Sequence, residues 1–260
     1  MRGPVLALAM GALVLAGCTD TQPTQVPPTP AALGPCRTIL SLRPQADLPA
    51  IRAEIEGQHI PDLIEIGDGA GTIGVGLRAR AECVARQIVA AYGSKVEVSV
   101  GLLPFPPRPT AIRGCRNGDW PFAKIPFLST TLDIQPAQIP QGEFFKGTVR
   151  FKNNGLALSS LDTSSYFTAY LFAAGVDVPL GTSEGGSLGT GLEFTLAPGQ
   201  SRDVPVFGGT ASCDPALGYV LPVGHYEARA TIDFSPPDGS GVHVFWSDPL
   251  PVEVVAASTP

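Results

Sequence analysis

The sequence lacks the patterns that mark several common kinds of catalytic and metal-binding site. It has no Cys-x-x-Cys pair, and its three histidines, His59, His225 and His243, stand far apart, so no zinc-ligand spacing is present. It has no His-Glu-x-x-His metalloprotease pattern. Its aspartates, such as Asp68, Asp133 and Asp162, do not cluster as calcium ligands would. We therefore expect a non-catalytic protein without a metal or other cofactor.

The sequence also has little charge of either sign. Only 15% of its residues are charged, the net charge is -6, and acidic and basic residues are interspersed. Without a basic cluster or basic residues interleaved with aromatic ones, we expect no nucleic-acid partner. What the chain has in abundance is glycine (30) and proline (27), a composition that favours many turns and short strands over long helices.

Long apolar runs are absent except at the amino terminus. The segment Val5 to Ala16 is apolar and follows a basic Arg2, which is typical of a secretory signal. It is shorter than the roughly 20 residues of a membrane-spanning helix. The residues Leu15-Ala16-Gly17-Cys18 that follow resemble the lipobox of bacterial lipoproteins. The alternative is an ordinary secretory signal with an incidental cysteine.

The lipobox resemblance implies a processed and lipid-modified amino terminus. Residues 1–17 would be removed as the signal peptide, and Cys18 would carry a diacylglycerol and often a further acyl chain such as palmitate. The protein would then be anchored on the extracytoplasmic side of the cell membrane, in the cell envelope. Residues 18–35 are rich in Thr and Pro and predict a tether, although an ordered arm packed on the body is an alternative.

Four cysteines remain after Cys18, an even number that suggests two disulfides in an exported chain. They are Cys36, Cys83, Cys115 and Cys213. We favour the pairs Cys36–Cys83 and Cys115–Cys213, because each pair would then stabilise one of two predicted domains. Spacing alone leaves the other pairings open, and Cys83 could equally reach Cys115.

Residues 36–107 predict a small α+β domain with the order β-α-β-β-α-β. Its pattern comprises a strand, a helix capped by Asp47, a hairpin at Asp68 to Gly71, a second helix and a strand at Val96 to Val100. We place the first strand at Arg37 to Leu42. This order resembles the ferredoxin-like sandwich, and other small α+β arrangements share it.

The same segment contains a literal Gly-x-G-x-x-Gly pattern, Gly69 to Gly74. A dinucleotide site needs a helix that begins inside the glycine loop. Here Ile73, Val75 and Leu77 alternate with glycines, so the chain is expected to continue as a strand. The pattern therefore predicts a glycine-rich hairpin and not a nucleotide site.

Residues 108–129 predict a linker, and residues 130–256 predict an all-β domain. Short alternating segments with frequent turn signals, such as Phe145 to Phe151 and Tyr226 to Phe234, favour an antiparallel sandwich. Tyr226, opening a late strand after a glycine-containing turn, resembles the tyrosine corner of immunoglobulin-like sandwiches.

Two turn-and-strand segments, "LAPGQS" (Leu196 to Ser201) and "LPVGHYEARATI" (Leu221 to Ile232), are similar to the BsuPI-like family of intracellular proteinase inhibitors. Val223 stands where that family's pattern usually has proline. The resemblance covers only the second half of the chain and implies an immunoglobulin-like fold more than it implies inhibition.

Together these observations favour a membrane-anchored binding module for a protein or cell-envelope ligand. The expected contact surface is the second domain, at the polar segments Asn153 to Ser165 and Leu180 to Gly191, because ligand contacts concentrate in loops on rigid scaffolds. A proteinase inhibitor and a structural envelope component remain as alternatives.

Overall fold

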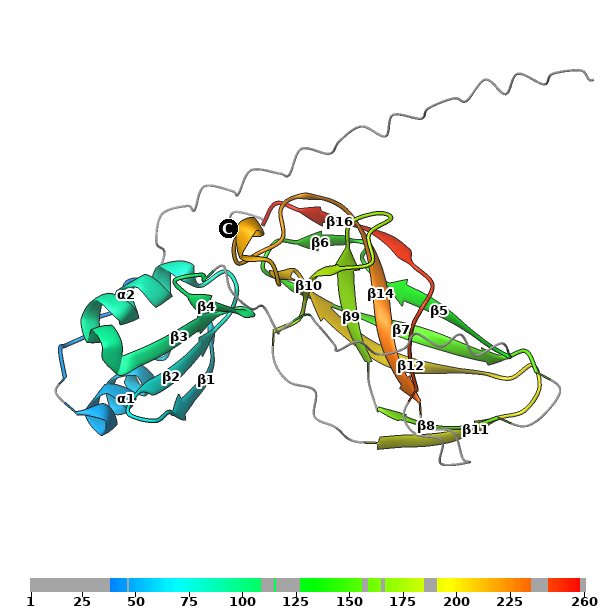
Figure 1. Cartoon of the computed structure of the whole chain (residues 1–260), viewed down its shortest axis with the longest axis horizontal. Helices are drawn as coiled ribbons and strands as arrows, with labels where there is room; N and C mark the ends of the chain where they lie inside the picture. The colour runs from blue at the N-terminus through cyan, green and yellow to red at the C-terminus, as the bar shows by residue number, and fades with distance from the viewer. Residues whose placement is uncertain are drawn as a thin grey trace, which may run out of the picture.

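The computed structural model describes residues 38–45, 47–108, 115, 127–155, 159–164, 167–184, 191–234 and 243–257. The expected signal peptide, Cys18, the tether and Cys36 lie outside these ranges. The described chain forms a small α/β domain followed by a mostly β domain (Figure 1).

The first domain is a four-stranded sheet with two helices. Its elements are α1 (Leu48–Gly57), β1 (Leu63–Asp68), β2 (Ile73–Leu77), α2 (Glu82–Tyr92), β3 (Val96–Val100) and β4 (Leu103–Phe105), with a 3-10 turn at Gly93–Lys95. The strands lie in the order β1-β2-β3-β4; β2 and β3 are parallel and the outer pairs are antiparallel.

Local sequence explains these elements. The Asp47 side chain accepts a hydrogen bond from the Ala50 N–H at 2.8 Å and caps α1, while Ile51 and Ile55 on one face of the helix are fully buried. In β2 and β3 every second residue is a buried aliphatic one, a period that places one side of each strand in the core. These residues are Ile73, Val75, Leu77, Val96, Val98 and Val100.

The expected strand at Arg37 to Leu42 is wrong, since residues 38–45 form no strand. Backbone N–H groups of this segment donate to side chains of the two helices and not to a neighbouring strand. The Leu40 N–H donates to Gln87 Oε1 at 2.8 Å and the Arg43 N–H to Glu54 Oε1 at 2.6 Å. The fourth strand is instead β4, which the hydrophobic pattern did not reveal.

This change also removes the ferredoxin-like resemblance. The element order is α-β-β-α-β-β, and strands that are consecutive in the sequence are neighbours in the sheet. In a ferredoxin-like sandwich, another strand lies between the two strands of each βαβ unit. Here β2 and β3, which precede and follow α2 in the sequence, pair directly with each other.

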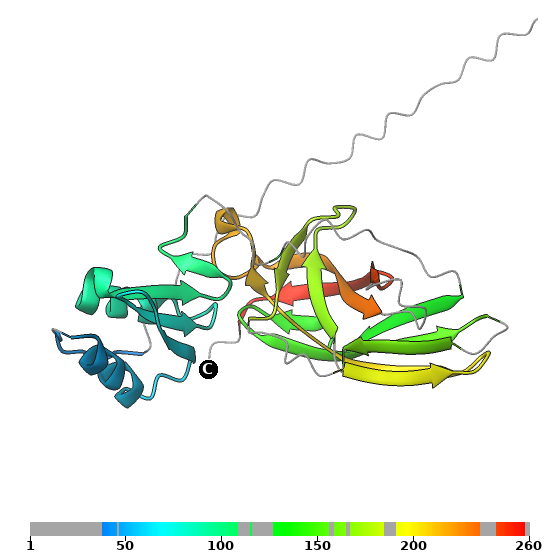
Figure 2. The ribbon, with the colours of Figure 1, turned by 60° about the horizontal axis from the view of Figure 1, so that its bottom comes forward.

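The second domain consists almost entirely of strands. They are β5 (Leu128–Ile134), β6 (Gln138–Pro140), β7 (Phe144–Asn153), β8 (Ser159–Ser164), β9 (Phe167–Phe172), β10 (Pro179–Thr182), β11 (Gly191–Leu196), β12 (Ser201–Gly209), β13 (Ala211–Ser212), β14 (Gly224–Phe234), β15 (His243–Trp246) and β16 (Leu250–Val255). The main sheet follows the order β5-β7-β12-β9-β14-β16-β6 and curls into a half-barrel (Figure 2).

Curling lets both ends of this sheet contribute to one core. Strands β5, β7 and β12 form one antiparallel group. Only β12 of this group pairs with β9, through a short parallel pairing of Val206 with Phe167 and Phe207 with Thr168. Aliphatic and aromatic residues from both sides of this seam pack together, including Phe151, Phe167 and Val254. The sequence predicted seven of these strands and the all-β character of the domain. It did not predict the strands β5, β6, β8, β10 and β13. The main sheet is one continuous path of hydrogen-bonded strands.

Two segments expected to be loops contain regular structure. Asn153 to Ser165 includes β8, and Leu180 to Gly191 begins within β10. Strand β8 pairs with β11 along six residue pairs as a separate two-stranded sheet. The buried Asn153 supports the chain nearby, because its side chain donates to the Leu196 carbonyl at 2.9 Å and accepts from the Gly155 N–H.

The two domains are packed against one another at the loop between β2 and α2. The Arg78 guanidinium lies 4.6 Å from the centre of the Phe144 ring. The Ala79 N–H donates to the Glu184 carboxylate, and Arg80 forms ion pairs with Asp62 and with Glu143 of the second domain.

Apolar contacts accompany these polar ones. Tyr219 of the second domain is 7% exposed and belongs to the core of the first domain together with Ala211. Its ring stacks on Phe105 with the centroids 6.1 Å apart. Leu102 packs against a buried cluster of the second domain that contains Cys115 and Cys213.

Cys115 and Cys213 form a disulfide with a Cα–Cα distance of 5.6 Å across 98 residues of sequence. Cys83 is also disulfide-bonded, and its partner lies outside the described ranges. Within those ranges, no helix is both long and apolar enough to cross a membrane.

We predict that replacing Cys115 and Cys213 together by Ala lowers the free energy of unfolding by about 2–4 kcal/mol, because the bridge restricts the unfolded chain over a long loop. Urea denaturation of the variant and the wild type measures the difference. Peptide mapping without reduction checks both expected bridges, and free thiols at Cys83 or Cys213 in freshly exported protein would contradict the framework of two disulfides.

The partly buried Glu184 predicts a pH dependence of stability. Burial raises the pKa of its carboxyl above the ordinary value, against the opposing effects of the Ala79 N–H, Arg78 and Arg80. The folded protein therefore binds this proton more tightly than the unfolded chain, and stability falls as pH rises from the ordinary to the raised pKa. We expect Glu184→Gln to flatten this part of the profile.

Urea denaturation between about pH 4 and pH 8 tests this expectation. Glu193→Gln, at an exposed position of β11, is the control and should leave the profile unchanged. If Glu184→Gln leaves the slope unaltered while lowering stability at neutral pH, the carboxylate stabilises the junction in its charged form and the prediction is wrong.

Candidate binding groove

The sheet of the first domain has one covered face and one open face. Because α1 and α2 pack on the side of Val75 and Val98, the alternate residues point to the other side. The register arranges these residues in two rows across the strands. The first row contains Glu65, Gly76, Ser99 and Pro104, and the second contains Gly67, Gly74 and Glu97.

Three glycines form the middle of this open face. Gly67 pairs with Gly74, and Gly76 lies beside them on β2. A Cβ atom added at Gly67 would have nothing within 4 Å, and one added at Gly74 would meet only the Gly67 carbonyl oxygen at 3.6 Å. The space over these two residues is therefore open, and the backbone is accessible. A glycine inside a strand often marks close approach by a ligand or another backbone.

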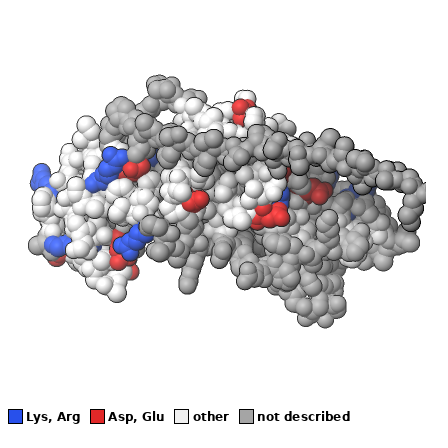
Figure 3. Space-filling model, turned by 45° about the horizontal axis from the view of Figure 1, so that its top comes forward, with Lys and Arg blue, Asp and Glu red and all other residues white. Residues whose placement is uncertain are grey.

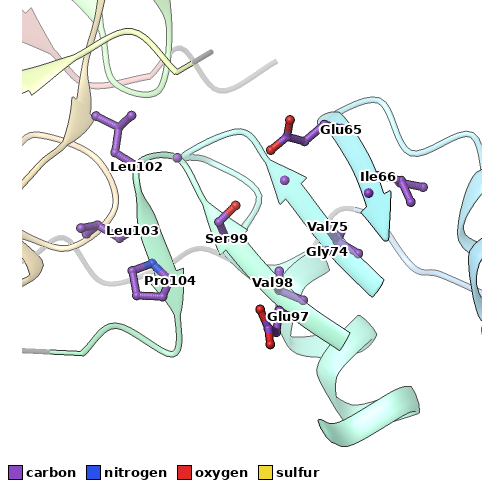
Figure 4. A pocket seen from close by; sticks show the side chains of 13 residues that line it. Glu65, Ile66, Gly74, Val75, Glu97, Val98, Ser99, Leu102, Leu103 and Pro104 are labelled. Carbon is purple, nitrogen blue, oxygen red and sulfur yellow. The ribbon is translucent and has the colours of Figure 1, made fainter. Parts of the chain in front are cut away.

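A groove of about 530 Å³ lies over this face. Its lining comes from all four strands and the turn between β3 and β4: Glu65, Ile66, Gly67, Gly74, Val75, Gly76, Glu97, Val98, Ser99, Gly101, Leu102, Leu103 and Pro104 (Figure 4). At the Leu102 end the groove adjoins the second domain, since Leu102 also packs against the Cys115–Cys213 cluster.

The charged side chains that line the groove are acidic. Glu65 and Glu97 are both exposed, and no Lys, Arg or His of the described chain lines it. The Glu65 side chain lies over Gly76, because a Cβ added there would be 2.7 Å from Glu65 Cγ. Elsewhere on this domain charges are mixed, and Figure 3 shows basic and acidic side chains next to one another at its end of the molecule. The groove thus differs in charge from its surroundings.

The lining combines exposed backbone, two carboxylates and one hydroxyl. Ser99 is the hydroxyl in the lining, and no histidine accompanies it. Across the described part of the chain, no group of three or more His, Cys, Asp or Glu residues is arranged to hold a metal ion.

The glycine pattern Gly69 to Gly74 forms the expected hairpin. The Gly69 N–H donates to the Thr72 carbonyl at 2.8 Å, Gly71 has a φ of +91°, and the chain enters β2 at Ile73. No helix begins within the pattern, as the sequence predicted. Its last glycine, Gly74, is part of the groove floor.

Tyr226 occupies the position expected of a tyrosine corner. Its hydroxyl is buried and donates to the Pro222 carbonyl, four residues upstream, at 2.8 Å. Burial raises the pKa of this hydroxyl, so the residue remains a neutral donor. It joins the start of β14 to the preceding turn, which is a structural role.

The sequence contains a Gly-x-Ser-x-Gly pattern at Gly181 to Gly185, a motif of hydrolases that the expectation of a non-catalytic protein overlooked. A nucleophile elbow needs a serine at a sharp turn between a strand and a helix, with a histidine partner. Ser183 follows β10 directly, but its described contacts include no hydrogen bond to a histidine. The histidines with described side chains, His59 and His225, are exposed.

Comparison with known proteins does not assign a family. No family model and no curated protein matches the chain. Among solved structures, Spo0M, a sporulation control protein from Bacillus subtilis, is 16% identical with a TM-score of 0.27, and the match covers 52% of this chain and 51% of Spo0M. A β-glucosidase from Listeria innocua, in complex with gluconolactone, is 17% identical with a TM-score of 0.28, over 54% of this chain and 18% of the enzyme.

This chain thus matches about half of Spo0M and less than a fifth of the glucosidase. TM-scores this low do not show a shared fold.

Proposed function

We propose that the protein is a lipid-anchored, extracytoplasmic binding protein that holds its ligand in the groove of the first domain. The observation that carries this proposal is the open sheet face with Gly67 and Gly74 at its centre. A solvent-facing sheet normally carries polar side chains on its outer face, whereas here the backbone itself is exposed over two strands.

The packing of the two domains supports a binding role. The groove ends beside Leu102, which is held by the disulfide cluster of the second domain, and the loop before α2 is fixed by contacts to Phe144 and Glu184. Binding sites gain affinity when their walls are rigid before the ligand arrives. The second domain would therefore act as a scaffold for the groove as well as a spacer.

We further propose that the second domain belongs to the immunoglobulin-like class. The Tyr226 hydrogen bond and the division of the curled sheet at the short β12–β9 pairing support this assignment. Such scaffolds serve many functions, so the resemblance to the BsuPI-like family supports the fold and adds no inhibitory site comparable to the groove.

The anchor predicts the location of the protein. Changing Cys18 to Ser should release it from the membrane fraction, because the acyl chains that hold it would be absent. Fractionation and detergent partitioning of the wild type and the variant measure this. Unaltered partitioning of the variant would defeat the assignment.

The groove predicts where the ligand binds. Gly74→Val should fill the floor while preserving the fold, because a β-branched residue suits a strand and the added Cβ meets only an ordinary contact. Immobilised wild-type and variant proteins would be exposed to envelope extract, and the retained components compared by mass spectrometry. We expect at least one component to be retained by the wild type and lost with Gly74→Val.

Thr148→Val is the matched control, since it places the same side chain at an exposed strand position of the second domain. It should retain the component at the wild-type level. Thermal unfolding checks that both variants are folded. If Gly74→Val is folded and retains everything that the wild type retains, the ligand does not occupy the groove and the proposal fails.

A further inference from the structure

We infer that the groove binds an extended peptide segment carrying two basic side chains, such as an exposed Lys- or Arg-containing strand of a partner protein. This inference rests on the proposed function, because it names the ligand class of the same groove. Its basis is the juxtaposition of a bare glycine floor, two carboxylates on different strands and an apolar end at Leu102 and Pro104 (Figure 4).

The position of the carboxylates favours a ligand with two separated positive charges. Glu65 lies on β1 and Glu97 on β3, with β2 between them, and their rows are offset by two residues. Two inter-strand spacings of roughly 4.8 Å and an offset of two residues at roughly 3.3 Å each place their Cα atoms about 12 Å apart. Residues four apart in an extended peptide lie about 13 Å apart on one side of the chain.

The described lining contains no cation to balance these carboxylates. Acidic residues on the helix-covered side of the sheet do have cationic partners, since Asp68 forms an ion pair with Arg52 and Glu82 forms one with Arg86. Glu65 and Glu97 have no ion pair among the described residues. A basic ligand would supply the missing positive charge, and complementary charge of this kind gives specificity and a faster association rate.

The floor and the apolar end favour a peptide over a polyamine. Over Gly67 and Gly74 a ligand backbone can approach the sheet closely. Pro104 and the half-buried Leu102 offer contacts to an apolar side chain, which a polyamine lacks. A polyamine would use the carboxylates alone.

Fluorescence anisotropy with defined peptides tests the inference on the full-length protein purified from membranes in mild detergent. The probe is a fluorescein-labelled heptapeptide with valine at its centre and lysines at its second and sixth positions. Matched peptides carry serines or glutamates at those two positions. We expect the lysine peptide to bind about tenfold more tightly than the serine peptide, the glutamate peptide not to bind, and the preference to decrease with added salt.

Charge variants locate the effect. Glu65→Gln and Glu97→Gln should each weaken binding of the lysine peptide by about threefold, the scale of an exposed ion pair, and leave the serine peptide unaffected. Glu193→Gln, at an exposed position of β11, is the control and should bind like the wild type. Spermidine, as a competitor, should displace the probe less effectively than unlabelled lysine peptide.

The outcomes separate this inference from the proposed function. If the lysine and serine peptides bind equally, or if both glutamine variants bind like the wild type, the groove does not recognise basic peptides and the inference is wrong. The proposed function would survive in that case if Gly74→Val still loses the retained envelope component. If spermidine displaces the probe as well as the lysine peptide does, the ligand is a polyamine and the peptide inference is overturned. If Gly74→Val alters neither the retention of envelope components nor the binding of the lysine peptide, both proposals fail.

Discussion

A sheet with helices on one face only must expose its other face unless something packs against it. In this protein α1 and α2 both lie on the side of Val75 and Val98, because the crossover from β2 to β3 and the amino-terminal helix use the same apolar face. Since successive side chains of a strand point to opposite faces of the sheet, the other residues of these strands form an exposed surface. The candidate site follows from this constraint, since the residues left outside are glycines and a few polar groups.

The junction with the second domain determines how that surface is presented. Arg78, Ala79 and Arg80 occupy three consecutive positions of one loop, and each contacts the second domain. Tyr219 extends the core of the first domain across the boundary. Two domains joined only by a linker would reorient freely. Here the buried Tyr219 ring and the more exposed contacts of Arg78 and Arg80 couple the groove to the scaffold. The coupling includes the partly buried Glu184 carboxyl, which accepts a hydrogen bond from the Ala79 N–H.

The sequence predicted most strands of both domains, because alternation is a strong signal where one face is buried, as in Val96 to Val100 and Phe145 to Phe151. It misplaced the strand at residues 37–42, since an apolar segment can pack beside helices and bond to side chains such as Gln87 without entering a sheet. It also missed the groove. Glu65, Ser99 and Glu97 read as ordinary outward residues in sequence, and only strand pairing brings them together around Gly74. One feature of the sequence indicated the groove: in β2 the aliphatic residues Ile73, Val75 and Leu77 alternate with the glycines Gly74 and Gly76.

The alternation in β2 also raises the question of whether packing requires the glycines Gly74 and Gly76 of the open face. A glycine in a strand costs roughly 0.5–1 kcal/mol relative to alanine, so Gly74 and Gly76 together cost about 1–2 kcal/mol by that scale. The buried side chains of Ile73, Val75 and Leu77, each at most 2% exposed, offset this cost on the other face of the same strand. Close packing does not require glycine at position 74, because an added Cβ there would meet only the Gly67 carbonyl oxygen at an ordinary 3.6 Å. At Gly147, by contrast, an added Cβ would lie 2.2 Å from the Asp133 carbonyl oxygen, and packing alone explains the residue. Gly74 lacks such a packing reason at its Cβ position, which agrees with the proposal that a ligand approaches the backbone of the open face.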